Sequence, residues 1–301
     1  MKYAIGIDIG GTKVSSGIVN EKGDLIQKEM VPSDPASADR MFGQVRACVA
    51  RLLGHSSIPI DEICGFGAGV PGKVDRKQGI AVYQNNLPWR NFHFKDRMRE
   101  AFGVDTVVID NDVYMAAFAE WQASGIDAED LFVYLTISTG ISSAIIQGGE
   151  FIRGAGFAGE IGLVPVRTAN PEQPAERLEW QASGPAIERR ARELLKNERV
   201  TTEEVFQMFY DGDKQAAQVM EEALEALAHG IYMMASVLDP NKLVFGGSVA
   251  VKNPLLLDLI KAKMKNYLIA EQQHVLGNME IGRLGNDQGI IGAGLRALTF
   301  E

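Results

Sequence analysis

The sequence predicts an α/β protein of two lobes with a cleft between them. Its 301 residues exceed the usual size of one domain. Apolar strands alternate with helical patterns along the chain. A strand, glycine turn, strand pattern at the N-terminus recurs after residue 130, which suggests an internal duplication. These features favour two related lobes, each presenting a hairpin loop, although two unrelated hairpins would give the same pattern.

The N-terminal lobe is expected to open with a β-meander. Gly10 and Gly11 lie in its first turn, where a chain without Cβ atoms bends most easily. The expected elements, in chain order, are strands at 3–8, up to 19 and from 25, a helix at 41–53, strands at 63–67 and 106–109, and a helix from 111.

The C-terminal lobe repeats the opening pattern and then becomes mainly helical. A polar, proline-rich stretch at 165–176 is interpreted as a surface excursion. The other expected elements are strands at 131–138 and 143–147, helices between 179 and 238, a strand at 242–247, and a final helix at 287–298 with glycines at 289, 292 and 294. We place the N-terminal lobe at residues 1–115 plus 287–301 and the C-terminal lobe at 116–286.

Composition excludes several classes of partner. A net charge of -9 and a pI near 5.1 oppose the positive field that nucleic-acid binding requires. The two cysteines, Cys48 and Cys64, are too few for a disulfide framework, and both are expected in the core. No apolar stretch is long enough to cross a membrane, and the first strand starts at Tyr3 without a signal segment. We therefore expect a cytoplasmic protein that binds neither nucleic acid nor membrane.

Two glycine turns have the chemistry of phosphate-binding loops. In residues 8–13, glycines at 10 and 11 let backbone N–H groups approach phosphate oxygens, and the Thr12 hydroxyl adds a donor. Lys13 contributes a positive charge, and Asp8 is a candidate ligand for hydrated Mg²⁺. The turn at Ser138-Thr139-Gly140 is a second phosphate cradle from the other lobe. A tight hairpin is the alternative for either turn alone, but the pair favours phosphate binding.

Asp112 follows a short strand and opens a helix, and taken alone it is best explained as an N-terminal capping residue. It is, however, part of one of five motifs that occur along the chain. The motifs are residues 8–13, Gly69-Val70-Pro71-Gly72, Asn86-Leu87-Pro88-Trp89, Asn111-Asp112 and Gly159-Glu160-Ile161-Gly162. In these motifs and in their order, the chain resembles the ROK family of sugar kinases and repressors over essentially its whole length.

The resemblance implies an actin-like (ribonuclease H-like) ATPase fold and transfer of the γ-phosphoryl group of ATP to a hexose, with Mg²⁺. The family's catalytic aspartate falls on Asp112, which would act as general base for the sugar hydroxyl. The family's sugar-binding positions fall on Gly69, Asn86, Asn111, Asp112, Glu160 and Glu179. The nucleotide would lie against Asp8, Gly10, Gly11, Thr12, Lys13, Thr139, Gly140, Gly246 and Gly247.

The sequence departs from the family pattern at two places. Leu163 stands where the family has a histidine, and residues 170–177 lack the family's cysteine cluster, so we expect no zinc site. Ser142 and Ser143 replace the usual glycines and make that loop less permissive. We expect Trp180, beside Glu179, to pack in the core, although stacking on a sugar is the alternative.

The first hypothesis is phosphorylation of glucose or a related aldohexose at the 6-hydroxyl. Fructose, N-acetylmannosamine or a β-glucoside is the alternative acceptor, and a non-catalytic sugar-binding regulator is the alternative class. A repressor of this family would carry a helix-turn-helix, for which the sequence before Tyr3 leaves no room. The resemblance also allows a homodimer, but we expect the apolar helix at 218–238 to serve the core.

Overall fold

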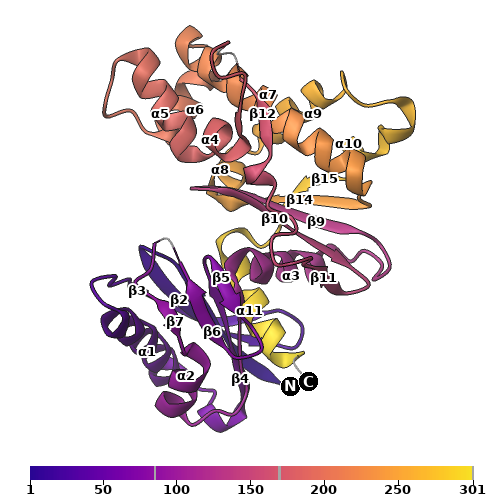
Figure 1. Cartoon of the computed structure of the whole chain (residues 1–301). Helices are drawn as coiled ribbons and strands as arrows, with labels where there is room; N and C mark the ends of the chain where they lie inside the picture. Colours follow the sequence, from indigo (N-terminus) through magenta and orange to yellow (C-terminus); the bar gives the residue numbers. More distant parts are fainter. Residues whose placement is uncertain (85, 169–170, 300–301) are drawn as a thin grey trace. The chain divides into compact units, whose positions relative to one another are not determined.

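The computed structural model describes residues 1–84, 86–168 and 171–299 (Figure 1). The chain divides into two compact units, residues 1–125 with 286–301 and residues 126–285. The boundary expected after residue 115 falls inside helix α3 (Asp112–Ser124), which belongs whole to the first unit.

The first unit is built on a mixed five-stranded sheet. Its strands, in spatial order, are β3 (Leu25–Pro32), β2 (Lys13–Asn20), β1 (Tyr3–Ile9), β4 (Ile63–Val70) and β8 (Val107–Asn111). The first three pair antiparallel, whereas β1, β4 and β8 run parallel. Helix α1 (Ala38–His55) packs on one face, and α3 with α11 (Gln288–Leu298) covers the other (Figure 1).

Smaller elements complete this unit. They are the short helix η1 (Ile60–Glu62), the three-stranded sheet β5 (Lys73–Asp75), β6 (Ile80–Tyr83) and β7 (Arg90–Phe92), and helix α2 (Phe94–Phe102). Helix α1 starts where Ser37 accepts a hydrogen bond from the Arg40 N–H, and its apolar stripe packs into the core.

Glycines let α11 lie directly on the sheet. A Cβ atom added to Gly6 in β1 would lie 1.8 Å from the Ile290 carbonyl oxygen, and one added to Gly67 in β4 would lie 1.8 Å from that of Ala293. No side chain fits in either gap, so backbone meets backbone.

The second unit repeats the strand arrangement of the first. Its sheet, in spatial order, contains β11 (Glu150–Ile152), β10 (Ile141–Gln147), β9 (Phe132–Ile137), β14 (Lys242–Gly246) and β15 (Met279–Ile281). Strand β9 pairs antiparallel with β10 and parallel with β14, as β1 does with β2 and β4. The duplicated hairpin therefore belongs to two similar sheets.

Helices of the second unit bury a large apolar core against this sheet. They are η2 (Ile161–Leu163), α4 (Leu178–Ala182), α5 (Gly184–Leu195), α6 (Thr202–Tyr210), α7 (Lys214–Leu238), α8 (Gly247–Lys252), α9 (Leu255–Met264), η3 (Ala270–Gln272) and α10 (His274–Gly277), with η4 (Gly285–Asp287) at the return to the first unit. Twelve residues of α7 are buried, so this helix serves the core as expected.

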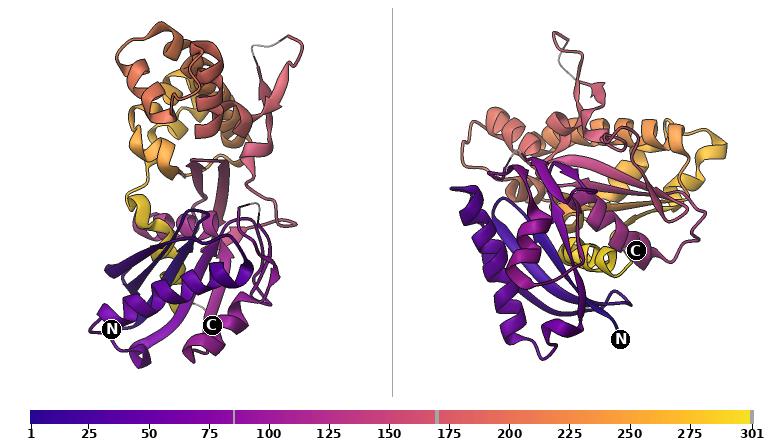
Figure 2. Two further views of the ribbon diagram at one scale, coloured as in Figure 1. Left: turned by 90° about the vertical axis from the view of Figure 1, so that its left-hand side faces the viewer. Right: turned by 60° about the horizontal axis from the view of Figure 1, so that its bottom comes forward.

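The surface excursion expected at 165–176 contains two short strands that the sequence did not predict: β12 (Pro165–Arg167) and β13 (Ala175–Arg177) form a hairpin that projects from this unit (Figure 2). Two other details differ from expectation. Cys48 is buried as expected, but Cys64 is exposed. Trp180 is 46% exposed, so its expected core position is wrong. Within the described residues, no helix is both long and apolar enough to span a membrane.

Candidate active site

The carboxyl ends of three parallel strands gather the acidic site residues of the first unit. Asp8 at the end of β1 is in register with Gly69 in β4, and Gly69 is in register with Asp110 in β8. Parallel strands end at the same edge of a sheet, where α/β proteins place their ligands. Asn111 and Asp112 follow Asp110 directly, so Asp8 and Asp112 lie at one edge.

Asn111, rather than Asp112, is the capping residue of α3. Its Oδ1 accepts the Val113 N–H at 2.9 Å, and its Nδ2 donates to the Gly72 carbonyl oxygen at 3.0 Å. The capping interpretation of Asp112 is therefore wrong, although its Oδ1 also accepts the Val113 N–H at 3.0 Å. Asp112 occupies the first helical position, where the helix dipole favours a carboxylate.

Gly69 of β4 packs closely against the start of α3. A Cβ atom at Gly69 would lie 3.3 Å from the Asp112 Cα atom and 3.4 Å from the Met115 side chain, so any larger residue would press on α3. Gly69 itself is buried. The structure thus gives this family position a packing role beneath Asp112.

The glycine turn between β1 and β2 is hydrogen-bonded to Ser33, the residue that follows β3, and Asn86 lies next to the turn. The Ser33 hydroxyl donates to the Gly10 carbonyl oxygen at 2.7 Å, and the Ser33 N–H donates to that of Thr12 at 3.0 Å. A Cβ atom at Gly11 would lie 3.3 Å from the Asn86 Nδ2 atom. The first unit therefore brings a phosphate-type turn beside a polar amide.

Asp8 lies against the first turn of α11. A Cβ atom at Gly289 would lie 3.0 Å from the Asp8 Cγ atom. Burial raises the pKa of the Asp8 carboxyl, and nearby Lys13 and Lys28 lower it in part. The Asp287 charge raises this pKa further. Mg²⁺ usually takes one or two carboxylates, several waters and substrate phosphates, and the half-buried Asp8 carboxylate beside a phosphate-type turn fits that donor set.

In the second unit, Glu179 is hydrogen-bonded to the glycine turn at residues 138–140. The Glu179 Oε2 atom accepts the Ile141 N–H at 2.9 Å, and a Cβ atom at Gly140 would lie only 2.6 Å from the same oxygen. The turn itself is closed by the Ser138 N–H, which donates to the Gly140 carbonyl oxygen at 2.9 Å. Thr139, at its tip, is exposed.

Glu160 is a partly buried carboxyl group whose pKa is influenced by the Glu179 charge. Burial raises the pKa of Glu160, the Ser142 hydroxyl lowers it through a hydrogen bond, and the Glu179 charge raises it. Ser143 holds the same loop, because its N–H donates to the Gly159 carbonyl oxygen at 2.8 Å and its hydroxyl at 2.5 Å. The two serines thus support the carboxylate loop, a role that the sequence did not indicate. Leu163, three residues after Glu160, is 45% exposed.

The pH dependence of stability should reveal the raised pKa of Glu160. Because its pKa is raised, Glu160 binds more protons in the folded than in the unfolded state, so stability falls as pH rises from the ordinary glutamate value through the raised one. We expect Glu160→Gln to raise the Tm of the sugar-free protein at pH 7 by no more than about 3 °C, since the carboxyl is partly solvated. Below the ordinary pKa of about 4.3 the difference should vanish.

Thermal unfolding between pH 4 and pH 8 measures this effect, with the exposed Glu150→Gln as the matched control. If Glu160→Gln lowered the Tm at pH 7 and Glu150→Gln did not, the raised pKa of Glu160 would be contradicted.

A pocket of about 540 Å³ opens beside the second glycine turn. The residues that line it come from the turn, α5, α6 and α8, and are Ser138, Thr139, Gly184, Pro185, Glu188, Thr201, Thr202, Glu203, Phe206, Gln207, Tyr210, Ser248, Val249, Lys252 and Asn253. The Ser138 and Ser248 hydroxyls are 3.0 Å apart, and the Gly184 N–H donates to the Ser138 carbonyl oxygen.

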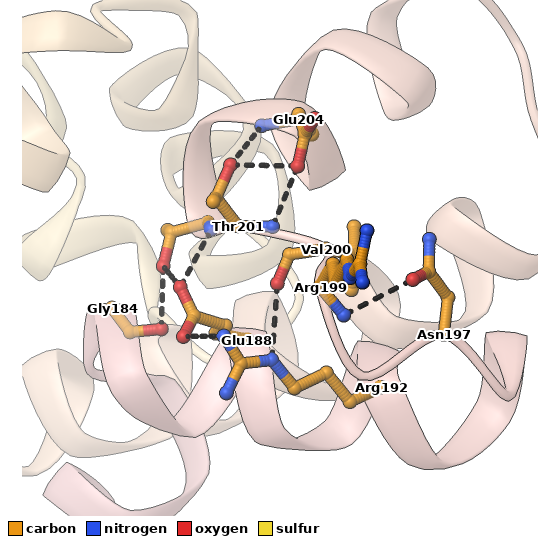
Figure 3. A network of polar contacts seen from close by, with 9 residues as sticks. Gly184, Glu188, Arg192, Asn197, Arg199, Val200, Thr201 and Glu204 are labelled. Atoms are coloured by element: carbon orange, nitrogen blue, oxygen red, sulfur yellow. Dashed lines mark hydrogen bonds and ion pairs between the residues drawn. The ribbon is translucent and has the colours of Figure 1, made fainter.

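One wall of this pocket is a polar network (Figure 3). Glu188 on α5 accepts the Thr202 N–H at 3.1 Å and pairs with Arg192, and Thr201 caps α6 together with Glu204. These contacts join α5 to α6 and keep the wall rigid. Sequence reasoning missed this wall, because its residues are separated in the chain from any glycine motif.

Gly246 and Gly247 are required where β14 meets α8. A Cβ atom at Gly246 would lie 2.0 Å from the Tyr134 Oη atom, and one at Gly247 would lie 2.4 Å from the Ile137 carbonyl oxygen. Gly247 also has φ +83°, which favours glycine. Ser248, the next residue, lines the pocket.

No zinc cluster stands out near the β12–β13 hairpin. In the described ranges, no group of three or more His, Cys, Asp or Glu side chains is arranged to hold a metal ion. Asn170, which begins the segment expected to lack zinc ligands, lies outside the described residues. The exposed Trp180 carries the Arg177 guanidinium 4.7 Å from its ring centroid.

Comparison with known proteins matches the chain to one family model and to sugar kinases of similar length. The model of the ROK family matches residues 4–299. A glucokinase of Halalkalibacterium halodurans is 29% identical, covering 97% of this chain and 94% of the relative. A β-glucoside kinase of Listeria monocytogenes is 26% identical, covering 100% and 99%.

A solved structure is similar over nearly the whole chain. The ROK family glucokinase of Streptomyces griseus, in complex with glucose and AMPPNP, has a TM-score of 0.79 and 26% identity, covering 97% of each chain. The predicted actin-like α/β fold is thereby confirmed.

Proposed function

Because the chain belongs to the ROK family, we propose that it is an ATP-dependent hexose kinase that phosphorylates glucose or a related aldohexose at the 6-hydroxyl. The observation that carries the proposal is the placement of Asp8 and Asp112 at one edge of parallel strands, beside the glycine turn. The similarity to glucokinases supports a sugar kinase.

Asp112 is proposed as the general base. It would accept the proton of the sugar hydroxyl as that oxygen attacks the γ-phosphorus, while Asn111 and Asn86 hold neighbouring hydroxyls. Glu160 and Glu179 of the second unit would bind further hydroxyls. Phosphoryl transfer depends mainly on positioning and on charge neutralisation, and these residues supply the positioning.

The nucleotide is proposed to use the glycine turns and the pocket beside Ser138. Phe206 and Tyr210 offer aromatic surface to a base, and Ser248 offers a hydroxyl. Among the described lining residues the only cation is Lys252, which pairs with Glu203 at 3.3 Å. This lining suits a nucleoside better than a chain of phosphates, which would need more positive charge.

Asp8 is proposed as the protein ligand of Mg²⁺. When bound, the ion would neutralise charge on the β- and γ-phosphates. The phosphates would lie next to the ion, against the turn formed by Gly10, Gly11, Thr12 and Lys13. The Thr139 and Gly140 turn, with Gly246 and Gly247, would hold the rest of the nucleotide.

A β-glucoside is the second candidate acceptor. Leu163 offers an exposed apolar side chain close in sequence to Glu160, where the family pattern has a histidine. An apolar surface there suits a substituent on the sugar better than a free hydroxyl. We also propose that the protein acts in the cytoplasm, where ATP is available and its two thiols stay reduced. That the protein forms a homodimer is a prediction that rests on the family resemblance alone.

A coupled ADP-release assay tests the proposal. Mg-ATP would be offered with hexoses, amino sugars and β-glucosides in turn. In a parallel series polyphosphate would replace ATP as donor, and the sugar phosphate formed would be measured directly, because this donor releases no ADP. We expect turnover with ATP on an aldohexose and none with polyphosphate. Sugar binding by calorimetry without turnover on any sugar would instead favour the non-catalytic regulator.

A further inference from the structure

Lys28 and Asp287 form an ion pair that joins β3 to the start of α11. The Lys28 Nζ atom contacts the Asp287 Oδ1 atom, and the two side chains are 33% and 36% exposed. Asp287 precedes the first turn of α11, where an aspartate usually accepts a backbone N–H of its own helix. Within the described residues, the Asp287 side chain makes no such capping hydrogen bond. Its carboxylate therefore binds Lys28 instead of its own helix.

The register of the sheet places Lys28 on the same face as Asp8. Gly6 of β1 is in register with Gly17 of β2, and Gly17 is in register with Lys28 of β3. Residues in register point to the same face of a sheet, and so do residues two apart in one strand. The start of α11 covers this face, because a Cβ atom at Gly289 would lie 3.0 Å from the Asp8 Cγ atom. The ion pair therefore lies on the side of the sheet to which Asp8 points.

Four charged groups act on one another at this end of α11. Burial has the largest effect on the pKa of the Asp8 carboxyl and raises it, whereas the positive charges of Lys13 and Lys28 lower it. The negative charge of Asp287 raises this pKa as well. Two positive and two negative groups balance each other. The complex of Mg²⁺ with ATP is an anion, so the loss of either lysine charge would make this end of the sheet repel it.

We propose that Lys28 and Asp287 are positioning residues of the proposed phosphate site: their pair holds a positive charge beside Asp8 and so favours binding of the Mg-ATP anion. This rests on the proposed function, in which Asp8 holds Mg²⁺. Lys28 offsets the charge of the Asp8 carboxylate. Asp287 keeps the ammonium in place, since a lysine side chain without a partner has many rotamers. The effect of the pair belongs to nucleotide binding rather than to the chemical step.

Lys28→Met tests the inference, because it removes the ammonium and keeps most of the side-chain length. We expect the Kd for Mg-ATP, measured by calorimetry, to rise about five- to thirtyfold, since the anion then meets two carboxylates and one cation. The KM for Mg-ATP should rise by a similar factor, while kcat changes by less than about threefold. Lys28→Arg keeps the charge and should restore most of the lost affinity. Lys22→Met, at an exposed lysine in the turn between β2 and β3, is the matched control.

A double-mutant cycle tests the part assigned to Asp287. In the Asp287→Asn background Lys28 has lost its partner, so Lys28→Met should raise the Kd for Mg-ATP by less than about threefold. The double variant should bind Mg-ATP more tightly than Lys28→Met alone, because one uncompensated negative charge is gone. These differences should shrink between about 0.05 and 0.5 M salt, where charges are screened. An equal rise of the Kd in both backgrounds would show that Asp287 does not hold Lys28 in place.

Failure of this inference and failure of the proposed function give different results. A wild-type chain that does not bind Mg-ATP would overturn both. A wild type that binds Mg-ATP, with Lys28→Met binding it equally tightly, would overturn this inference alone. Should Lys28→Met not fold, Lys28→Gln gives the same comparison, because it keeps a polar end at this partly exposed position.

Discussion

Asp112→Asn is expected to lower kcat for sugar phosphorylation by about 10²- to 10⁴-fold, the usual contribution of a general base. Asparagine keeps the size and hydrogen-bonding reach of the side chain but cannot take the proton from the sugar hydroxyl. Asn111 still caps α3 in the variant, so the helix should start at the same residue. Sugar affinity should accordingly change by only a few-fold.

Steady-state kinetics together with calorimetric sugar binding measure this result. Asp127→Asn, at an exposed position beyond α3, controls for the loss of one negative charge. Loss of the helix-dipole interaction at the first helical position accounts for at most about 1 kcal/mol of stability, so unfolding does not explain a large kinetic loss. A variant that keeps kcat within tenfold of the wild type would show that Asp112 is not the base.

The sheets of both units were predictable because their strands are apolar runs bounded by glycine turns. Residues 3–8 and 131–138 are long enough, and their turns clear enough, to fix the two hairpins from local pattern alone. The β12–β13 hairpin was missed, because its three-residue strands carry polar side chains and bury only Val166 fully. Its pairing depends on backbone hydrogen bonds, which leave no pattern in the sequence.

The candidate site was predictable where the residue type itself carries the chemistry. Asp8 lies at the end of β1 and Asp112 directly follows β8, and Gly69 of β4 is in register with both Asp8 and Asp110. Supporting contacts were not predictable, because they join residues distant in the chain. Ser142 was expected only to make its loop less permissive than glycine, yet its hydroxyl interacts with Glu160. Trp180 was expected in the core, yet the short helix α4 turns its ring outward, with Arg177 against it.

Among single glycine-to-alanine substitutions in the first unit, Gly292→Ala is expected to lower the stability of the protein most. A Cβ atom at Gly292 would lie 1.7 Å from the Met115 carbonyl oxygen and 2.6 Å from its carbon. Both atoms belong to the backbone of α3, so no side-chain rotation relieves the overlap. Separating α11 from α3 should destabilise the protein by at least about 3 kcal/mol. That loss corresponds to a Tm lower by about 6 °C or more in a protein of this size.

Gly43→Ala is the matched control for this prediction. Gly43 lies on the exposed side of α1, and an added Cβ atom would meet no heavy atom within 4 Å. Alanine there should stabilise the helix by about 0.5–1 kcal/mol. Thermal or urea unfolding of both variants measures the contrast. Equal stabilities for the two variants would show that α11 and α3 are not in backbone contact at Gly292.

The same substitution connects packing to catalysis. Helix α3 begins at Asp112, and Gly289, one turn before Gly292 on α11, lies against Asp8. Any folded Gly292→Ala protein must therefore shift α3, which begins at Asp112, or α11, which packs against Asp8. Displacements of about 1 Å reduce rates by about a hundredfold. We expect kcat to fall with little change in ATP affinity, whereas Gly43→Ala should leave both unchanged.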